Sequence, residues 1–367
     1  MDTTIEFFNT TIAPSVIGAV TDTLQSTRIS AGIKADMFES NLQQYGLSNP
    51  VTVNSGTVTM HLALLAAGIG PGDEVIIPAQ TFIATGMAVL YVGATPVFAD
   101  INRYDGNISI ESIRQKITNK TKAIIPVHWA GYPCDMDSIN NIAKQHNLAV
   151  IEDAAHAFGA TYKNQLIGSI SRFTSFSFQA IKHLTTGDGG ALCCKSIEDA
   201  NLVKRLRWFD IDRESTKTGF LGEREYDAIN IGYKYHMNDI AATIGIENLK
   251  QIDIKLNKIR NIAKQYQGEL ANISYIKLMN YELERSSSYW LFPLIVDNRD
   301  KFITYMRKNN IPVSVIHLGI DNNSIFGGQR DDLPNQRWFD ENQIHIPIHD
   351  ALTQKQVETI IKTIKEY

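Results

Sequence analysis

The stretch VIIPAQTFIATGMAVLYVGATPVFA, residues 75–99, carries no charged side chain and decides the class of fold. Its length would suffice to span a bilayer, but prolines, glycines and polar side chains recur along it. A buried strand, a helix and a second buried strand in succession is therefore the better interpretation. Two strands joined by a helix form the unit from which parallel sheets are built.

The same alternation of strand-like and helix-like runs extends over residues 50–195. Most of the strand-like runs are apolar on both faces, which is typical of strands that helices cover on two sides. The expected strands are Glu74–Pro78, Pro96–Asp100, Lys122–His128, Leu148–Asp153, Phe173–Phe178 and Gly190–Cys194. The expected helices run from Thr57, from Thr81, across Asp135–His146 and across Ser196–Trp208. We predict an α/β fold with a mixed, mostly parallel central sheet covered by helices.

The composition of the sequence changes after Trp208. A charged stretch that contains glycines predicts a mobile loop, and a helical pattern then runs from Asp239 to about Leu270. Two strand-like runs and a terminal helix are expected after it, Trp290–Val296, Ile311–Ile316 and Gln354–Tyr367. Pro293 inside the first of these runs suits an edge strand better than a central one.

This pattern divides the chain into two expected domains. A chain of 367 residues is long enough to bury a sizeable core as one large domain or two ordinary ones. We expect a large domain with an N-terminal arm over residues 1–250 and a smaller α+β domain over residues 251–367.

Composition excludes several classes of partner. Lys plus Arg total 35 against 39 Asp plus Glu, a net charge of -4 without runs of like charge, so we expect no nucleic-acid partner. The opening MDTTIEFFNTTIAPS lacks the basic and apolar segments of a signal peptide. The cysteines Cys134, Cys193 and Cys194 form no CxxC pair, which disfavours disulfides and thiolate metal sites. We expect a cytoplasmic protein without a membrane partner.

Motifs for dinucleotides, ATP and metals are not supported. The glycines of Gly68–Gly72 follow a helix and precede a strand, the reverse of the dinucleotide-binding order, and GxxxxGK[ST] does not occur. HExxH does not occur either, and Pro347 lies between the two histidines that are four positions apart, His345 and His349. We assign no metal.

Two segments place polar groups at the ends of expected strands. Asn54-Ser-Gly-Thr57 lies where an apolar run meets a helix, so free backbone N–H groups and two hydroxyls could bind an anion there. The alternative is an ordinary helix cap. Asp153, in IEDAAHA, ends a buried strand, where open α/β sheets bind ligands. A cap or an internal ion pair is the alternative for Asp153, and a core histidine is the alternative for His156.

The segment FTSFSFQAIKHLTTGDGG, residues 173–190, places Lys182 between a buried strand and a glycine-rich turn. A lysine that is partly withdrawn from water loses basicity and can form a Schiff base with an aldehyde. The alternative is a solvated surface lysine.

Taken together and in this order, NSGT, EDAAHA and FSFQAIKHLTTGDGG closely resemble the DegT/DnrJ/StrS family of aminotransferases, which use pyridoxal phosphate, mostly on nucleotide-linked keto sugars. The resemblance covers nearly the whole chain. It extends over the further segments Gly70–Asp100, Pro126–Ile139, Leu221–Gly245 and Ile344–Val357.

The resemblance implies a fold-type-I transferase and a role for each residue of the site. Lys182 would bind the cofactor covalently and act as general base, and Asp153 would pair with the pyridine nitrogen and keep it protonated. The other implied contacts are Phe82 against the ring face, His156 near the ring hydroxyl, and Gly56, Thr57 and Ser177 at the phosphate. The alternative for Phe82 is a core aromatic.

In this family a second subunit completes the site, so the resemblance implies a homodimer with shared sites. The residue that commonly reaches the phosphate is an asparagine in a GY-N-Y segment, and here Gly232-Tyr-Lys-Tyr235 has Lys234 instead. An ammonium can bind phosphate as a point charge, although a solvated loop lysine is the alternative. Asn238 is a candidate cap for the helix from Asp239.

The expected reaction is transfer of an amino group from an amino acid, L-glutamate by resemblance, to the keto group of a nucleotide-linked deoxy sugar. Some relatives carry histidine in place of the reactive lysine and dehydrate their substrate, but here Lys182 is present and His183 is its neighbour. The alternatives are amination of a small phosphorylated ketone or aldehyde, a sugar dehydratase, and a regulatory family member without activity.

Overall fold

A computed structural model describes residues 4–213 and 215–367. Its main sheet has seven strands in the order β1-β9-β8-β5-β4-β2-β3. These strands are β1 (Pro50–Val53), β2 (Glu74–Pro78), β3 (Thr95–Ala99), β4 (Thr121–Ile124), β5 (Ala149–Asp153), β8 (Phe173–Ser177) and β9 (Gly190–Cys194). Pairing is parallel from β3 through β8, whereas β9 and β1 are antiparallel to their neighbours. The predicted mixed, mostly parallel sheet is confirmed.

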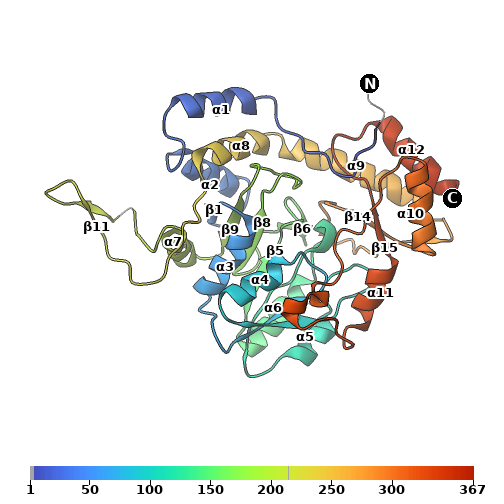
Figure 1. Cartoon of the computed structure of the whole chain (residues 1–367), viewed down its shortest axis with the longest axis horizontal. Coiled ribbons are helices and arrows are strands. Elements are labelled where there is room, and N and C mark those ends of the chain that lie inside the picture. Colours follow the sequence, from blue (N-terminus) through green and yellow to red (C-terminus); the bar gives the residue numbers. More distant parts are fainter. Residues whose placement is uncertain (1–3, 214) are drawn as a thin grey trace.

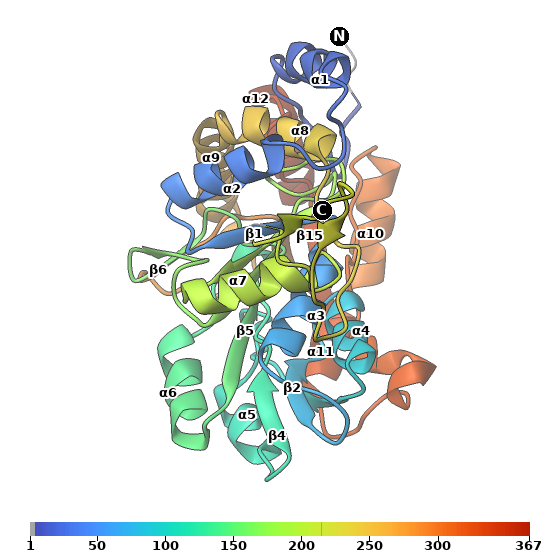
Figure 2. The ribbon, with the colours of Figure 1, turned by 90° about the vertical axis from the view of Figure 1, so that its left-hand side faces the viewer.

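Helices cover both faces of this sheet, because alternate strand residues point to opposite sides. Val75 and Ile77 of β2 belong to one hydrophobic cluster and Ile76 to the other. One face is covered by α3 (Gly56–Ala66), α4 (Ala84–Tyr91) and α7 (Ile197–Leu206). The other is covered by α2 (Lys34–Gln44), α5 (Ile110–Lys116), α6 (Met136–His146) and α8 (Asp239–Leu249), so α3 and α6 flank the strands in Figure 2. Residues 75–99 form β2, α4 and β3, as predicted.

The C-terminal part of the chain builds a second sheet (Figure 1). This sheet has a hydrophobic cluster of its own. The sheet consists of β12 (Ile276–Leu278), β14 (Phe292–Val296) and β15 (Gln343–Ile346). The helices α9 (Ile252–Leu270), α10 (Arg299–Lys308) and α12 (Gln354–Lys365) pack against it. Ile252 and Leu256 of α9 belong to the core of the main sheet, and Ile259 onward belongs to this cluster. The domain boundary at residue 250 stays a prediction.

Shorter elements complete the chain. They are α1 (Val16–Gln25), η1 (Trp129–Gly131), β6 (Thr161–Tyr162), β7 (Gln165–Leu166), β10 (Lys217–Thr218), β11 (Arg224–Glu225), β13 (Arg285–Ser286), η2 (Ile320–Asn322), η3 (Ser324–Phe326) and α11 (Pro334–Asn342). The β10–β11 hairpin projects from the body of the molecule (Figure 1). Within the described ranges, every helix is too short or too polar to cross a membrane.

Three expectations about the C-terminal half are wrong. The helix expected over residues 239–270 is two helices, because α8 ends at Leu249 and Gln251 leaves the helical region. Residues 311–316 form only an isolated bridge, Ser314 to His345. Pro293 lies in the central strand β14, and it is tolerated because pairing with β12 ends at Leu294, which leaves Pro293 paired on one side only.

One strand of the main sheet and one of its covering helices are shorter than predicted. The strand expected over Lys122–His128 ends at Ile124, and the chain beyond it bends into η1. The helix expected from Thr81 begins at Ala84. The intervening turn leaves Thr81 buried and Phe82 exposed.

Candidate active site

Adjacent parallel strands bring Lys182 and Asp153 to one edge of the main sheet. Asp153 ends β5 and is paired with Ser175 of β8, and Lys182 follows the carboxyl end of β8 by five residues. Ligands of open α/β sheets bind at this edge. The two side chains also interact electrostatically, since each charge shifts the pKa of the other group.

Lys182 is held in partly apolar surroundings. Its Nζ lies 3.7 Å from the centroid of the Trp290 ring, and its backbone N–H donates to the Gln179 carbonyl at 2.9 Å. Burial lowers the pKa of Lys182 to about 7 against the opposing influence of Asp153. Near neutral pH a large share of this lysine is therefore the uncharged, nucleophilic amine. A solvated surface lysine does not fit this environment.

Asp153 is almost completely buried and accepts two hydrogen bonds. Thr85 Oγ1 donates to Oδ2 at 2.8 Å and the Ala155 N–H donates to Oδ1 at 3.1 Å. Burial raises the pKa of Asp153, and the hydrogen bonds from Thr85 and Ala155 and the charge of Lys182 oppose that rise. The carboxylate is thus paired and oriented at the edge of the sheet.

His156 stacks on Trp290 beside Lys182. The two rings are nearly parallel, with centroids 3.7 Å apart and planes at 15°. Burial, followed by the charge of Lys182, holds the pKa of His156 well below its ordinary value, so the imidazole is neutral. Its Nδ1 is buried and has no hydrogen-bond partner among the described residues. A free ring nitrogen of this kind is available to a ligand.

Phe82 is not a core aromatic, since 54% of it is exposed. Its ring lies 5.4 Å from that of His317, which in turn lies 6.1 Å from His156 in a stacked arrangement. Phe82 therefore belongs to the same group of rings as His156 and Trp290. Burial, with the charge of Lys182, lowers the pKa of His317 to about 4.

The start of α3 is suited to an anion. Ser55 is the N-cap residue of the helix and has an extended backbone, but its side chain makes no capping hydrogen bond. The N–H groups of the first turn are thus left to another acceptor. A Cβ on Gly56 would lie 2.7 Å from Ser177 Cβ, so only glycine permits this close approach. Gly56 and Ser177 are side by side, and Thr57 follows in the same turn.

Lys234 lies apart from this group. It is exposed, its Nζ lies 3.8 Å from the Trp208 ring centroid, and its carbonyl accepts a bond from Asn54 Nδ2 at 3.4 Å. Its backbone is therefore near the start of α3, while its ammonium is directed to Trp208 of its own subunit. Asn238 caps α8 by accepting the Ala241 N–H at 2.8 Å, as expected.

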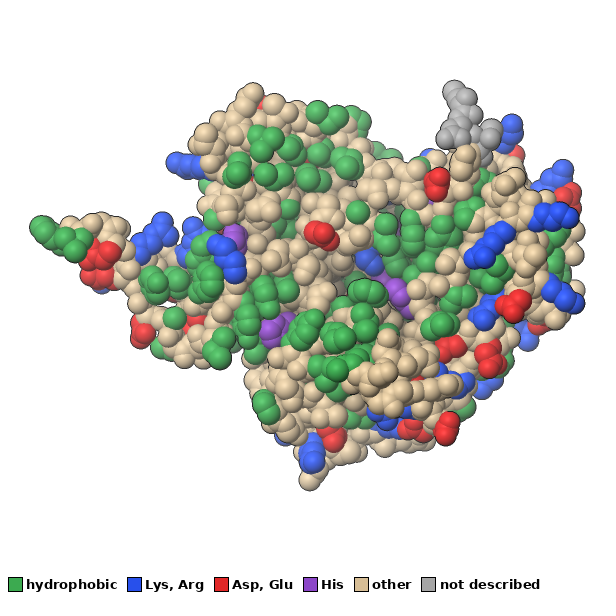
Figure 3. All heavy atoms as spheres, in the orientation of Figure 1, with side chains coloured by type: hydrophobic (Ala, Val, Ile, Leu, Met, Phe, Trp, Pro, Cys, Tyr) green, Lys and Arg blue, Asp and Glu red, His purple; other side chains and the backbone are tan. Residues whose placement is uncertain are grey.

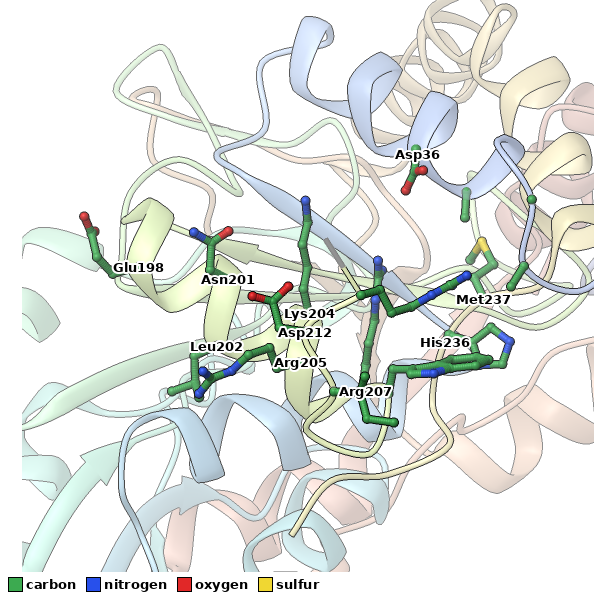
Figure 4. A pocket seen from close by; sticks show the side chains of 16 residues that line it. Asp36, Glu198, Asn201, Leu202, Lys204, Arg205, Arg207, Asp212, His236 and Met237 are labelled. Carbon is green, nitrogen blue, oxygen red and sulfur yellow. The ribbon is translucent and has the colours of Figure 1, made fainter. Parts of the chain in front are cut away.

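A cavity of about 530 Å³ beside α7 is distinct from this site (Figure 4). Among the described residues, those that line it include none of the predicted cofactor contacts. Three of its basic side chains pair with acidic ones, Lys204 and Arg207 with Glu39 and Arg205 with Asp210, and the Arg213 guanidinium lies over the Trp208 ring. We assign no ligand to it. In residues 4–213 and 215–367, no cluster of three His, Cys, Asp or Glu side chains is placed to hold a metal ion.

Three residues of the site were missed by the sequence analysis: Thr85, Trp290 and His317. Thr85 lies in the segment TFIAT, where only Phe82 was singled out. Trp290 and His317 come from the C-terminal part of the chain and reach the site only through the packing of the second sheet on the first. No local pattern indicates them.

Solved structures that this one closely resembles are sugar aminotransferases of fold type I, and the shared fold assigns this protein to that class. The sugar aminotransferase CalS13 from Micromonospora echinospora superposes with a TM-score of 0.94, 30% identity and coverage of 99% of both chains. The PLP-form of the putative sugar aminotransferase Spr1654 from Streptococcus pneumoniae superposes with a TM-score of 0.90 and 32% identity, and the match covers 99% of this chain and 98% of that one.

The chain belongs to the DegT/DnrJ/EryC1/StrS aminotransferase family, whose model matches residues 10–365. The GDP-perosamine synthase of Escherichia coli O157:H7 is 34% identical over 96% of this chain and 97% of its own length. The spore coat polysaccharide biosynthesis protein SpsC of Bacillus subtilis is 34% identical over 97% of this chain and 95% of its own. The protein is an enzyme, an aminotransferase, and the expected family is confirmed.

Proposed function

We propose that this aminotransferase uses pyridoxal phosphate to move an amino group from an amino acid, L-glutamate, to the keto group of a nucleotide-linked deoxy sugar. One observation carries the proposal: Lys182, with a pKa of about 7, lies within electrostatic reach of the buried carboxylate of Asp153 at the ligand-binding edge of the sheet. A relative that is a perosamine synthase and a fold neighbour that is a sugar aminotransferase support a sugar substrate.

Observed features of the site fit a phosphorylated pyridine ring that carries a hydroxyl group. The uncapped first turn of α3, with Gly56 against Ser177, offers N–H groups to a phosphate. The free Nδ1 of His156 fits a ring hydroxyl, and the buried Asp153 fits a protonated ring nitrogen. We therefore assign Gly56, Thr57 and Ser177 to the phosphate, Asp153 and His156 to the ring edge, and Phe82 to the ring face.

Pyridoxal phosphate, when bound, supplies an aldehyde that joins amines and a ring that withdraws electrons from the adjoining carbon atoms. Lys182 provides the amine that binds the aldehyde in the resting enzyme. In its uncharged form the Lys182 amine would take the proton from the α-carbon of the amino acid and return it to C4′ of the cofactor, on the other side of the transferred nitrogen. Asp153 would keep the pyridine nitrogen protonated, because its negative charge favours the pyridinium.

We also propose that two copies of the chain form a dimer that shares its sites. Large apolar side chains are exposed on α1 and on the projecting hairpin (Figure 3). Ile17 of α1 is exposed, and Phe220 of the hairpin is fully exposed. Such surfaces are typical of interfaces. A second copy is the partner we favour, because Lys234, also exposed, follows the same hairpin and could then reach the phosphate of the neighbouring site.

The function is tested with the purified protein, pyridoxal phosphate and L-glutamate. We expect the visible absorbance of the bound cofactor to disappear on addition of glutamate and to return on addition of a nucleotide-linked keto sugar, with an amino sugar as product in the mass spectrum. A dehydrated sugar as product would establish a sugar dehydratase. Amination of a small phosphorylated ketone, without amination of the sugar, would establish an aminotransferase for small ketones. Cofactor binding without turnover on any ketone would indicate a regulatory protein.

A further inference from the structure

Two threonine side chains lie behind Asp153. Thr85 Oγ1 donates to Asp153 Oδ2 at 2.8 Å, and the hydroxyl oxygens of Thr81 and Thr85 are 2.7 Å apart. Because Thr85 has one hydroxyl hydrogen and uses it on Asp153, Thr81 must be the donor to Thr85. The two hydroxyl groups therefore form a relay whose hydrogens both point toward the carboxylate.

The whole relay is withdrawn from water. Thr81, Thr85 and Asp153 are all buried. In such surroundings a hydrogen bond to a carboxylate is strong, and each donor polarises the next one in the chain. The relay belongs to the turn that presents Phe82 to the site and starts α4, so one short segment fixes both the ring face and the support of the carboxylate.

We propose that Thr85, supported by Thr81, is a positioning residue that keeps Asp153 ionised and aimed at the pyridine nitrogen of the cofactor. The inference rests on the proposed function, since it concerns the residue that holds the proton of the ring. Without the hydroxyl, burial favours the neutral acid, which cannot stabilise a positive charge beside it.

Two other titratable groups act on Asp153 from neighbouring elements, Lys182 after β8 and His128 after β4. Positive charge on either of them lowers the pKa of the Asp153 carboxyl, as the Thr85 hydrogen bond does, whereas burial raises it. His128 is engaged elsewhere, with Nε2 2.8 Å from Glu152 and Nδ1 accepting the Cys134 N–H at 3.0 Å. Thr85 is the side chain that donates directly to the carboxylate.

Three variants test the proposal. Thr85→Val keeps the shape of the side chain and removes the hydroxyl, Thr85→Ser keeps the hydroxyl, and Thr81→Val breaks the relay one step further away. The protonation of Asp153 is followed in the cofactor-free protein by its infrared carboxyl band, which is identified by subtracting the spectrum of Asp153→Asn. In the loaded enzyme, the acidic limb of the kcat–pH profile is measured.

We expect Thr85→Val to raise the midpoint of the carboxyl titration by roughly one to two pH units, the equivalent of one hydrogen bond to a charged group. Thr81→Val should raise it less, and Thr85→Ser should keep the wild-type midpoint. The acidic limb of the kcat profile should move in the same order.

An unchanged midpoint in folded Thr85→Val, or equal shifts in Thr85→Val and Thr85→Ser, would overturn the role. If Thr85→Val does not fold, Thr81→Val leaves Thr85 in place, and an unchanged midpoint in it would overturn the relay. The infrared titration needs no cofactor, so a wild-type protein that fails to bind pyridoxal phosphate would count against the proposed function alone.

Discussion

Replacement of Asp153 by asparagine should leave the fold intact and remove most of the transamination. Both carboxylate oxygens accept a hydrogen bond, from Thr85 and from the Ala155 N–H. An amide keeps one acceptor and places an NH₂ group where the other donor expects an oxygen. It also carries no negative charge, so it cannot hold a proton on the pyridine nitrogen.

The magnitude follows from the lost charge. A hydrogen bond between charged groups, here the carboxylate and the protonated ring nitrogen, contributes about 1.5–3 kcal/mol, whereas the donor left unpaired by the amide is unpaired in ground state and transition state alike. A loss of about 3 kcal/mol in the transition state lowers the rate roughly a hundredfold, since each 1.4 kcal/mol is a factor of ten. The effect should fall on kcat, because glutamate itself does not contact Asp153 in this assignment.

The assay is the half-reaction with L-glutamate, followed by rapid mixing and the absorbance of the bound cofactor. Asp135→Asn is the matched control, because Asp135 caps α6 outside the site and asparagine caps a helix equally well. Thermal unfolding verifies the fold of both variants. A half-reaction in Asp153→Asn within a few-fold of the wild type would refute the role of the carboxylate.

Three further predictions concern the phosphate, the lysine and the dimer. Gly56→Ala should weaken binding of pyridoxal phosphate in a fluorescence titration, because its Cβ would meet Ser177, whereas Gly268→Ala, with open space around it, should bind normally. Lys182 should make the free energy of unfolding of the cofactor-free protein rise more steeply, or fall less, from pH 7 to pH 10.5 than in Lys182→Met, because its pKa is about 7 when folded and 10.5 when unfolded, so at this group the unfolded chain binds more protons in that window. Denaturant titrations of the two proteins measure this difference, and an equal pH dependence in both would contradict the lowered pKa. Mixing inactive Lys182→Ala with weakened Lys234→Ala should raise activity if a hybrid dimer regains one intact site, and no gain despite demonstrated subunit exchange would exclude a shared site.

The sequence predicts the main sheet and the residues that follow its strands, since these depend on local patterns. Asp153 ends a run of buried residues, and Lys182 lies between such a run and a glycine-rich turn. The local sequence pattern therefore places both residues at the end of a strand. Gly56 is found for the same reason, at the junction of a strand and a helix. Their roles toward the cofactor stay predictions.

Tertiary packing decides what the sequence does not predict. Trp290 approaches Lys182 and bonds to the Ile181 carbonyl at 2.9 Å from 109 positions further along the chain, and no periodicity encodes that contact. Pro293 is accepted in a central strand because a neighbouring strand ends one residue away. The chain passes from one hydrophobic cluster to the next inside α9, between Leu256 and Ile259, and not at the break between α8 and α9.

The central claim is that Lys182 is the lysine that binds the cofactor. Its most direct test is borohydride reduction of the protein with pyridoxal phosphate bound, followed by digestion and peptide mapping by mass spectrometry. The account predicts one labelled peptide with the added mass on Lys182, and loss of that label in Lys182→Ala. Label on another lysine of the wild-type protein, with Lys182 unmodified, would contradict the account.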